Sequence, residues 1–188
     1  HAGAKGLMQL MPYTAKLVAK QAKLPYSKSR LTTDPEYNIN LGSHYIAGLI
    51  LEYEGAYPFA IAAYNAGPKR VRYWKKINKN PQKNQIDYVD WIELIKFKET
   101  RNYVQRVLEN YNVYRYILEQ KPIPMKDFFK NNPLFWNMAE EEGFEPSVQV
   151  SSHGHLANDW FKPLTHSSMK FVADWLYWII NINKVIIH

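Results

Sequence analysis

The strongest constraint on the fold is a helical repeat of apolar residues in the first third of the chain. Ahead of the repeat, the run Thr33-Asp34-Pro35-Glu36 combines an N-cap candidate, an early proline and a glutamate three residues after Thr33. We therefore predict a helix that begins near Thr33 and closes near Gly55. Its buried face, spaced by three and four residues, consists of Ile39, Gly42, Ile46, Leu49, Ile50 and Tyr53.

The chain up to about Phe129 carries further helical patterns and no convincing alternation of a β-strand. Short polar connections separate these segments, so helix-on-helix packing is the expected architecture. We predict an all-α fold. The expected helices are an amphipathic one over Tyr13–Leu24, a short and almost wholly apolar one from Pro58 to Tyr64, one over Asp87–Leu94, and a long one through Tyr103 to Leu118.

Charge is distributed unevenly along the 188 residues. The net charge is +7, with +10 on residues 1–139 and −3 on residues 140–188. A basic globular part suits an anionic partner, which leaves nucleic acid, an anionic membrane surface and an acidic polymer open. The chain has no Cys, so it has neither a disulfide framework nor a thiolate metal site.

The two ends of the chain suggest a different organisation from its middle. It has no initiator Met and no leader pattern, so we expect a secretion signal or earlier residues to lie outside it. Residues 131–188 lose the helical pattern, and we expect an unrelated, irregular C-terminal tail after a domain at 1–130. The apolar run 171–182 is shorter than the roughly 20 residues of a membrane helix. His153, His155 and His166 lack a metal-ligand spacing, so no metal site is expected there.

Three motifs, taken in order, resemble the signature of the soluble lytic murein transglycosylase (SLT) family. They are Gly3–Pro12, which contains Gly-Leu-Met-Gln, then Ala62–Pro68, and then Glu99–Val104. The resemblance extends to residues 34–42, 91–93 and 111–116, about two-thirds of the chain. It implies a lysozyme-like helical domain with a glycan-binding cleft, working in the periplasm or cell envelope of a bacterium.

The resemblance also implies an activity. Family members cleave the glycosidic bond between N-acetylmuramic acid (MurNAc) and N-acetylglucosamine (GlcNAc) in peptidoglycan and leave 1,6-anhydro-MurNAc ends, using one catalytic Glu and no metal or cofactor. Cleaving an acetal requires a proton on the leaving oxygen, which a positioned carboxylic acid supplies. In the family pattern that Glu lies ahead of the position of His1, so we expect no catalytic acid in this chain and little or no turnover by it.

The residues expected to bind substrate follow from the same motifs. Gln9, Asn65 and the Tyr64 hydroxyl can form hydrogen bonds with acetamido or hydroxyl groups of a sugar. Glu93 falls where related enzymes place a carboxylate facing the peptide stem, although Lys96 replaces the usual proline. The complete expected set is Met8, Gln9, Tyr64, Asn65, Ala66, Glu93 and Tyr103, with peptidoglycan glycan strands as the partner.

Each of these motifs can also be interpreted as purely structural. Gly6–Gln9 alone could be a helix entry, and Asn65–Pro68 a helix stop. Glu99 and Arg101 are expected to cap a helix and take part in an ion pair. The basic stretch Lys69–Lys79 is expected to be a solvated helix face, so nucleic acid is not an expected partner. The alternative to an enzyme is a non-catalytic peptidoglycan-binding module. Oligomeric state is left open.

Overall fold

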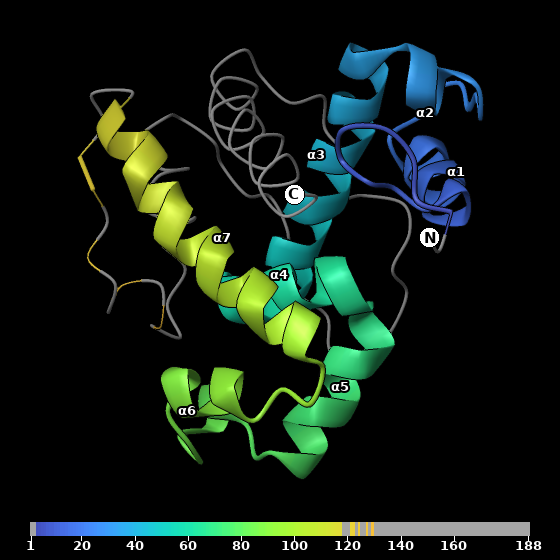
Figure 1. Ribbon diagram of the computed structural model, residues 1–188. Coiled ribbons are helices and arrows are strands. Elements are labelled where there is room, and N and C mark those ends of the chain that lie inside the picture. The colour runs from blue at the N-terminus through green and yellow to red at the C-terminus, as the bar shows by residue number, and fades with distance from the viewer. Residues whose placement is uncertain (1–2, 118–120, 123, 125–126, 128, 130–188) are drawn as a thin grey trace, which may run out of the picture. The chain divides into compact units, whose positions relative to one another are not determined.

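A computed structural model describes residues 3–117, 121–122, 124, 127 and 129 (Figure 1). The described part contains helices and no strand, which confirms the all-α prediction. Its only β-type pairing is an isolated antiparallel bridge between Lys5 and Leu10. The helices are α1 Pro12–Gln21, α2 Arg30–Thr33, α3 Pro35–Glu52, α4 Tyr57–Ala66, α5 Pro68–Ile77, the 3₁₀ helix η1 Pro81–Lys83, α6 Tyr88–Glu93 and α7 Lys98–Ile117.

The start of α3 differs in detail from the expected capping box. Thr33 belongs to α2, and its hydroxyl bonds to the carbonyl of Ser29 at 3.2 Å. Asp34 takes the capping position instead, since its carboxylate accepts the backbone N–H of Tyr37 at 3.0 Å. Because this hydrogen bond and Arg30 both favour the ionised form, the pKa of Asp34 is lowered. The prediction of Thr33 as the N-cap is therefore wrong by one residue.

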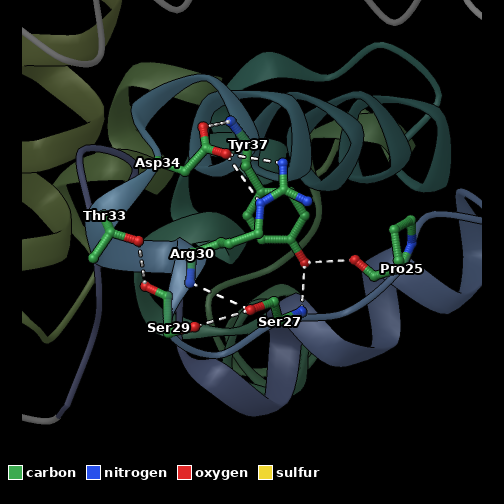
Figure 2. A network of polar contacts seen from close by, with 7 residues as sticks. All are labelled: Pro25, Ser27, Ser29, Arg30, Thr33, Asp34 and Tyr37. Carbon is green, nitrogen blue, oxygen red and sulfur yellow. Dashed lines mark hydrogen bonds and ion pairs between the residues drawn. The ribbon is translucent and has the colours of Figure 1, made fainter.

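Tyr37 ties the chain before α2 to the first turn of α3 (Figure 2). Its hydroxyl donates to the carbonyl of Pro25 at 2.9 Å and accepts the N–H of Ser27 at 3.0 Å. The guanidinium of Arg30 lies over the Tyr37 ring, 4.3 Å from the ring centre, and forms a 2.8 Å ion pair with Asp34. Polar contacts thus stabilise the connection between α1 and α3.

The described residues divide between two compact units at His44–Tyr45, within α3. In the second unit α4 packs against both α5 and α7, and α6 against α7 (Figure 1). Every residue of α4 from Tyr57 to Ala63 is buried, as the apolar composition of this segment indicates. α4 is therefore the central helix of the second unit.

Phe59 is the main aromatic contact of that core. It is fully buried, and its ring meets Trp91 edge-on at 4.6 Å between ring centres and Tyr88 at 5.4 Å. The ammonium of Lys75 lies 4.6 Å from the same ring, and burial lowers the pKa of this lysine. Residues from α4, α5 and α6 are thus held together by one side chain.

Several expectations lie outside the described residues. These are the irregular tail at 131–188, its three histidines, and the last predicted residue of the long helix, Leu118. Among the described residues, no helix combines the length and the apolar character needed to span a bilayer.

Replacing Phe59 by Ala tests the assignment of the core. We expect Phe59→Ala to lower the free energy of unfolding by about 3–5 kcal/mol, because it leaves a cavity between three elements. Val113 lies exposed on α7, and Val113→Ala should change the free energy by less than about 0.5 kcal/mol. Urea unfolding followed by circular dichroism measures both. Similar small changes in the two variants would contradict this description of the core.

Candidate functional site

The Gly-Leu-Met-Gln motif forms a tight turn rather than the entry of a helix. Lys5 and Leu10 exchange two backbone hydrogen bonds of 2.9 and 3.0 Å, which close the chain around residues 6–9. Gly6 and Gln9 have φ values of +72° and +47°. A left-handed Gln is unusual, and here its side-chain amide donates to the carbonyl of Gly6 at 2.8 Å. The turn therefore presents Gln9 on an exposed loop in a defined conformation.

Asn38 holds this turn against α3. Its side chain is fully buried, with Oδ1 accepting the N–H of Met8 at 2.7 Å and Nδ2 donating to the carbonyl of Lys5 at 3.1 Å. The Lys5 carbonyl thus accepts from Asn38 as well as from the N–H of Leu10, and the N–H of Met8 finds an acceptor in Asn38. One amide thus connects both sides of the motif to the first half of α3.

Two glycines allow the close approach that this arrangement requires. A Cβ on Gly6 would lie 2.1 Å from the carbonyl oxygen of Leu31 and 2.4 Å from Asn38. A Cβ on Gly42, one turn after Asn38 on α3, would lie 2.6 Å from the buried Met8 side chain. Met8 therefore belongs to the packing under the turn, while Gln9 is its exposed polar group.

The second motif lies at the end of α4 and is joined to the third motif at the start of α7. Asn65 accepts a hydrogen bond from the Thr100 hydroxyl and donates to the Glu99 carboxylate at 3.3 Å. Gly67, with φ of +89°, ends α4 immediately after Ala66. The segment therefore ends a helix and can also contribute to a site, because Asn65 is exposed at the end of α4.

Tyr64, Tyr103 and Tyr45 form a tyrosine cluster beside Asn65. The Tyr45 and Tyr64 rings lie 5.2 Å apart, and Tyr103 lies close enough to Tyr64 to affect its ionisation. Burial raises the pKa of all three phenols, that of Tyr45 to about 12. Like any phenol, all three are protonated at neutral pH and can donate hydrogen bonds.

Glu93 lies at the end of α6 and is oriented by α7. Gln105 donates to its carboxylate at 2.6 Å, and the guanidinium of Arg101 lies 4.0 Å away and also bonds to the Glu93 carbonyl. The side chain stays 57% exposed. Arg101 thus forms its ion pair with Glu93 rather than with Glu99. Glu99, in the first turn of α7, contacts Asn65.

Of the expected residues, the structure brings together Tyr64, Asn65, Ala66 and Tyr103 in the second unit, and places Met8 and Gln9 on one turn in the first. Sequence reasoning missed the roles of Asn38 and Tyr45. A signal was present, since both lie three or four residues from Gly42 on the predicted helix, and Asn38 is a polar residue on an otherwise apolar stripe.

Comparison with known proteins agrees with these motifs. Residues 1–87 match the profile of the family described as "Transglycosylase SLT domain". Residues 1–87 of this chain therefore have the sequence pattern of that family. The soluble lytic murein transglycosylase of Escherichia coli K12 is 43% identical to this chain over 124 residues, which are 65% of this chain and 19% of the relative.

Two solved structures resemble this chain. An inactive glutamate-to-glutamine mutant of the Pseudomonas aeruginosa lytic transglycosylase shares 41% identity over 65% of this chain and 19% of its own, with a TM-score of 0.58. The soluble lytic transglycosylase of E. coli shares 43% identity over 64% of this chain and 19% of its own, with a TM-score of 0.59. These neighbours confirm the lysozyme-like helical fold. The chain spans about a fifth of the length of the relatives that it matches.

Two glycines of the same helix provide a matched test of the turn. Gly42→Ala should lower the free energy of unfolding by about 1–3 kcal/mol, because the new methyl group overlaps the Met8 side chain. The turn cannot move away from α3 without breaking the hydrogen bonds of Asn38. A Cβ on Gly48 meets nothing within 4 Å, so Gly48→Ala should raise stability by up to about 1 kcal/mol. Thermal and urea unfolding measure both. A Gly42→Ala variant as stable as Gly48→Ala would show that the turn does not pack on α3 as described.

Proposed function

We propose that this chain is part of a peptidoglycan lytic transglycosylase, which cleaves the MurNAc–GlcNAc bond and leaves 1,6-anhydro-MurNAc ends. The match of residues 1–87 to the SLT domain supports the reaction class, and the named activity of the E. coli relative supports murein as the substrate. The same relatives support a place of action in the bacterial cell envelope, and we propose the periplasm.

The observation that carries this proposal is the direct connection between two of the three family motifs. Asn65 of the second motif is hydrogen-bonded to Glu99 and Thr100 of the third. A helix stop alone would need no such contacts. They fix the side-chain amide at the exposed end of α4, where a preorganised polar group loses little entropy on binding a sugar.

Each substrate-binding residue then has a chemical role. Gln9 offers an amide that can accept and donate hydrogen bonds to hydroxyl or acetamido groups. The Tyr64 and Tyr103 phenols are hydrogen-bond donors at neutral pH, and their rings provide an apolar surface for the face of a sugar. Ala66 contributes shape rather than a polar contact, whereas Met8 is fully buried and supports the turn that presents Gln9, so the expectation that Met8 contacts the sugar is not kept. We propose that the other residues bind and orient the glycan.

The general acid is a separate matter. The inactive glutamate-to-glutamine mutant from P. aeruginosa indicates that a glutamate is essential in that relative. No residue of this chain matches the acid of the family pattern. Because general-acid catalysis contributes about 10²–10⁴-fold in rate, we propose that this chain by itself has little or no turnover.

Glu93 is the proposed contact for the peptide stem of the substrate. Gln105 and Arg101 hold its carboxylate in one orientation while more than half of the side chain stays exposed. An exposed, oriented carboxylate suits an amine or amide N–H of a peptide. We therefore assign it to peptide recognition and not to acid catalysis.

Shortening Gln9 tests the glycan contact. In the Gln9→Asn variant, Asn tolerates the positive φ of position 9, and its side chain is one methylene shorter, so the amide group lies closer to the backbone. We expect the affinity for uncrosslinked glycan strands to fall about threefold to tenfold, the effect of losing one hydrogen bond. Gln21→Ala, at the exposed end of α1, is the control. Isothermal titration calorimetry measures both, and equal affinities for Gln9→Asn and Gln21→Ala would remove Gln9 from the binding surface.

Neutralising Glu93 tests the peptide contact. We expect Glu93→Gln to weaken binding to glycans that carry stem peptides by about fivefold, and to leave binding to peptide-free glycans unchanged. Glu109 is a closely matched control, because it is 58% exposed and pairs with Arg106 on the same helix. Parallel titrations with both glycans are the measurement. A Glu93→Gln variant that behaves like Glu109→Gln on peptide-bearing glycans would refute the assignment.

A further inference from the structure

A surface outside the proposed glycan site is formed by α5 and the segment 94–98. Three contacts align them: the Arg70 guanidinium lies 5.2 Å from the Phe97 ring, the Trp74 and Phe97 rings meet edge-on at 5.3 Å, and Asn78 donates to the carbonyl of Leu94 at 2.9 Å. Positions 70, 74 and 78 follow each other at intervals of four, so they form one stripe along α5. We call α5 with residues 94–98 the α5 surface.

The α5 surface is cationic. Residues 55–86 contain seven Lys/Arg and no Asp/Glu. Arg72 is paired with Glu52, and Lys75 lies against the rings of Tyr53 and Phe59. The remaining exposed cations of the surface make no ion pair within the described part of the chain. They are Lys69, Arg70, Lys76, Lys96 and Lys98.

Glu93, Glu99 and Asp87, which follow the basic stretch in sequence, contact groups outside the α5 surface. Glu93 faces Gln105 and Arg101, and Glu99 faces Asn65. Asp90 lies on α6, and Asp87 caps α6 by accepting the N–H of Val89. The cations of the α5 surface are therefore available to an external anion.

Apolar side chains lie among these cations. Tyr73 is 51% exposed, Ile77 42%, Leu94 49% and Phe97 43%. In addition, Lys69, Arg70 and Tyr73 line a hollow of about 370 Å³. The two cationic residues at this hollow suit a small anionic group such as a phosphate.

We propose that the α5 surface docks on an anionic phospholipid bilayer, with a headgroup phosphate in the hollow and the exposed apolar side chains in the interfacial region. A bilayer uses both features of the surface, since cations attract its headgroups and aromatic and aliphatic side chains enter its boundary. A hydrophilic polymer leaves Ile77 and Leu94 without a function. Nucleic acid gains nothing from two exposed aliphatic side chains either.

Vesicle sedimentation with the full chain tests this proposal. Phosphatidylcholine vesicles are compared with vesicles in which phosphatidylglycerol replaces part of the lipid. The chain should bind the anionic vesicles and not the neutral ones. Lys69→Gln/Arg70→Gln should weaken binding about 30-fold, or about fivefold for each cation near the surface. Lys16→Gln/Lys20→Gln removes the same charge from exposed positions on α1 and should change binding less than about twofold.

A second pair of substitutions tests the apolar part. Ile77→Ser/Leu94→Ser leaves every charge in place and should weaken vesicle binding about tenfold or more, since both side chains lose apolar burial. Circular dichroism confirms that each variant is folded. An equal loss in the α5 and α1 charge pairs, unchanged binding of Ile77→Ser/Leu94→Ser, or binding to duplex DNA as tight as to anionic vesicles would overturn the proposal. The vesicles contain no glycan, so these outcomes are independent of the proposed enzymatic function.

Discussion

Burial of α4 is the constraint on which the second unit depends. Seven consecutive residues, Tyr57–Ala63, are buried, and a helix that is apolar on all sides is stable only when other elements cover it. α5 and α7 supply that cover, and Phe59 brings Trp91 of α6 into the same core. The last turn of α4 then emerges with Tyr64 and Asn65. The site residues of this unit are thus positioned by the same packing that stabilises it.

In the first unit, polar groups position the family motif. Its Gly-Leu-Met-Gln turn is closed by the bridge between Lys5 and Leu10, and Asn38 adds two hydrogen bonds to it from within α3. A buried amide with both ends satisfied stabilises one arrangement, because a displaced turn would leave this buried amide without these hydrogen bonds. Gly42 removes the steric obstacle. In both units a side-chain amide, Asn38 or Asn65, connects a family motif to a helix.

The sequence predicted what depends on periodicity and on motifs. The all-α class, the position of α3 and the buried character of α4 follow from apolar spacing, and Asn65–Pro68 was recognised as a helix stop. Prediction was weaker for short elements. The four-residue helix α2 leaves no periodic signal and was not predicted. Because α2 includes Thr33, Asp34 rather than Thr33 caps α3.

The roles of Asn38 and Tyr45 could not be read from the sequence alone, although both share a stripe with Gly42. Their partners, Met8 and Tyr64, lie about 20–30 residues away in the chain, and only the folded structure brings each pair together. The motif at Gly6–Gln9 is a further example. Its turn conformation depends on the hydrogen bonds of Asn38 and on the left-handed Gln9, neither of which has a local sequence signature.

The central proposal is that this chain provides glycan-binding residues of a lytic transglycosylase. The most direct test is a hybrid of the E. coli relative in which the matching part of this chain replaces the corresponding 124 residues. Purified peptidoglycan is incubated with the hybrid and with this chain alone, and the products are analysed by mass spectrometry. The account predicts 1,6-anhydro-muropeptides from the hybrid only. A folded hybrid that binds peptidoglycan without releasing these products would contradict it and favour a non-catalytic binding module.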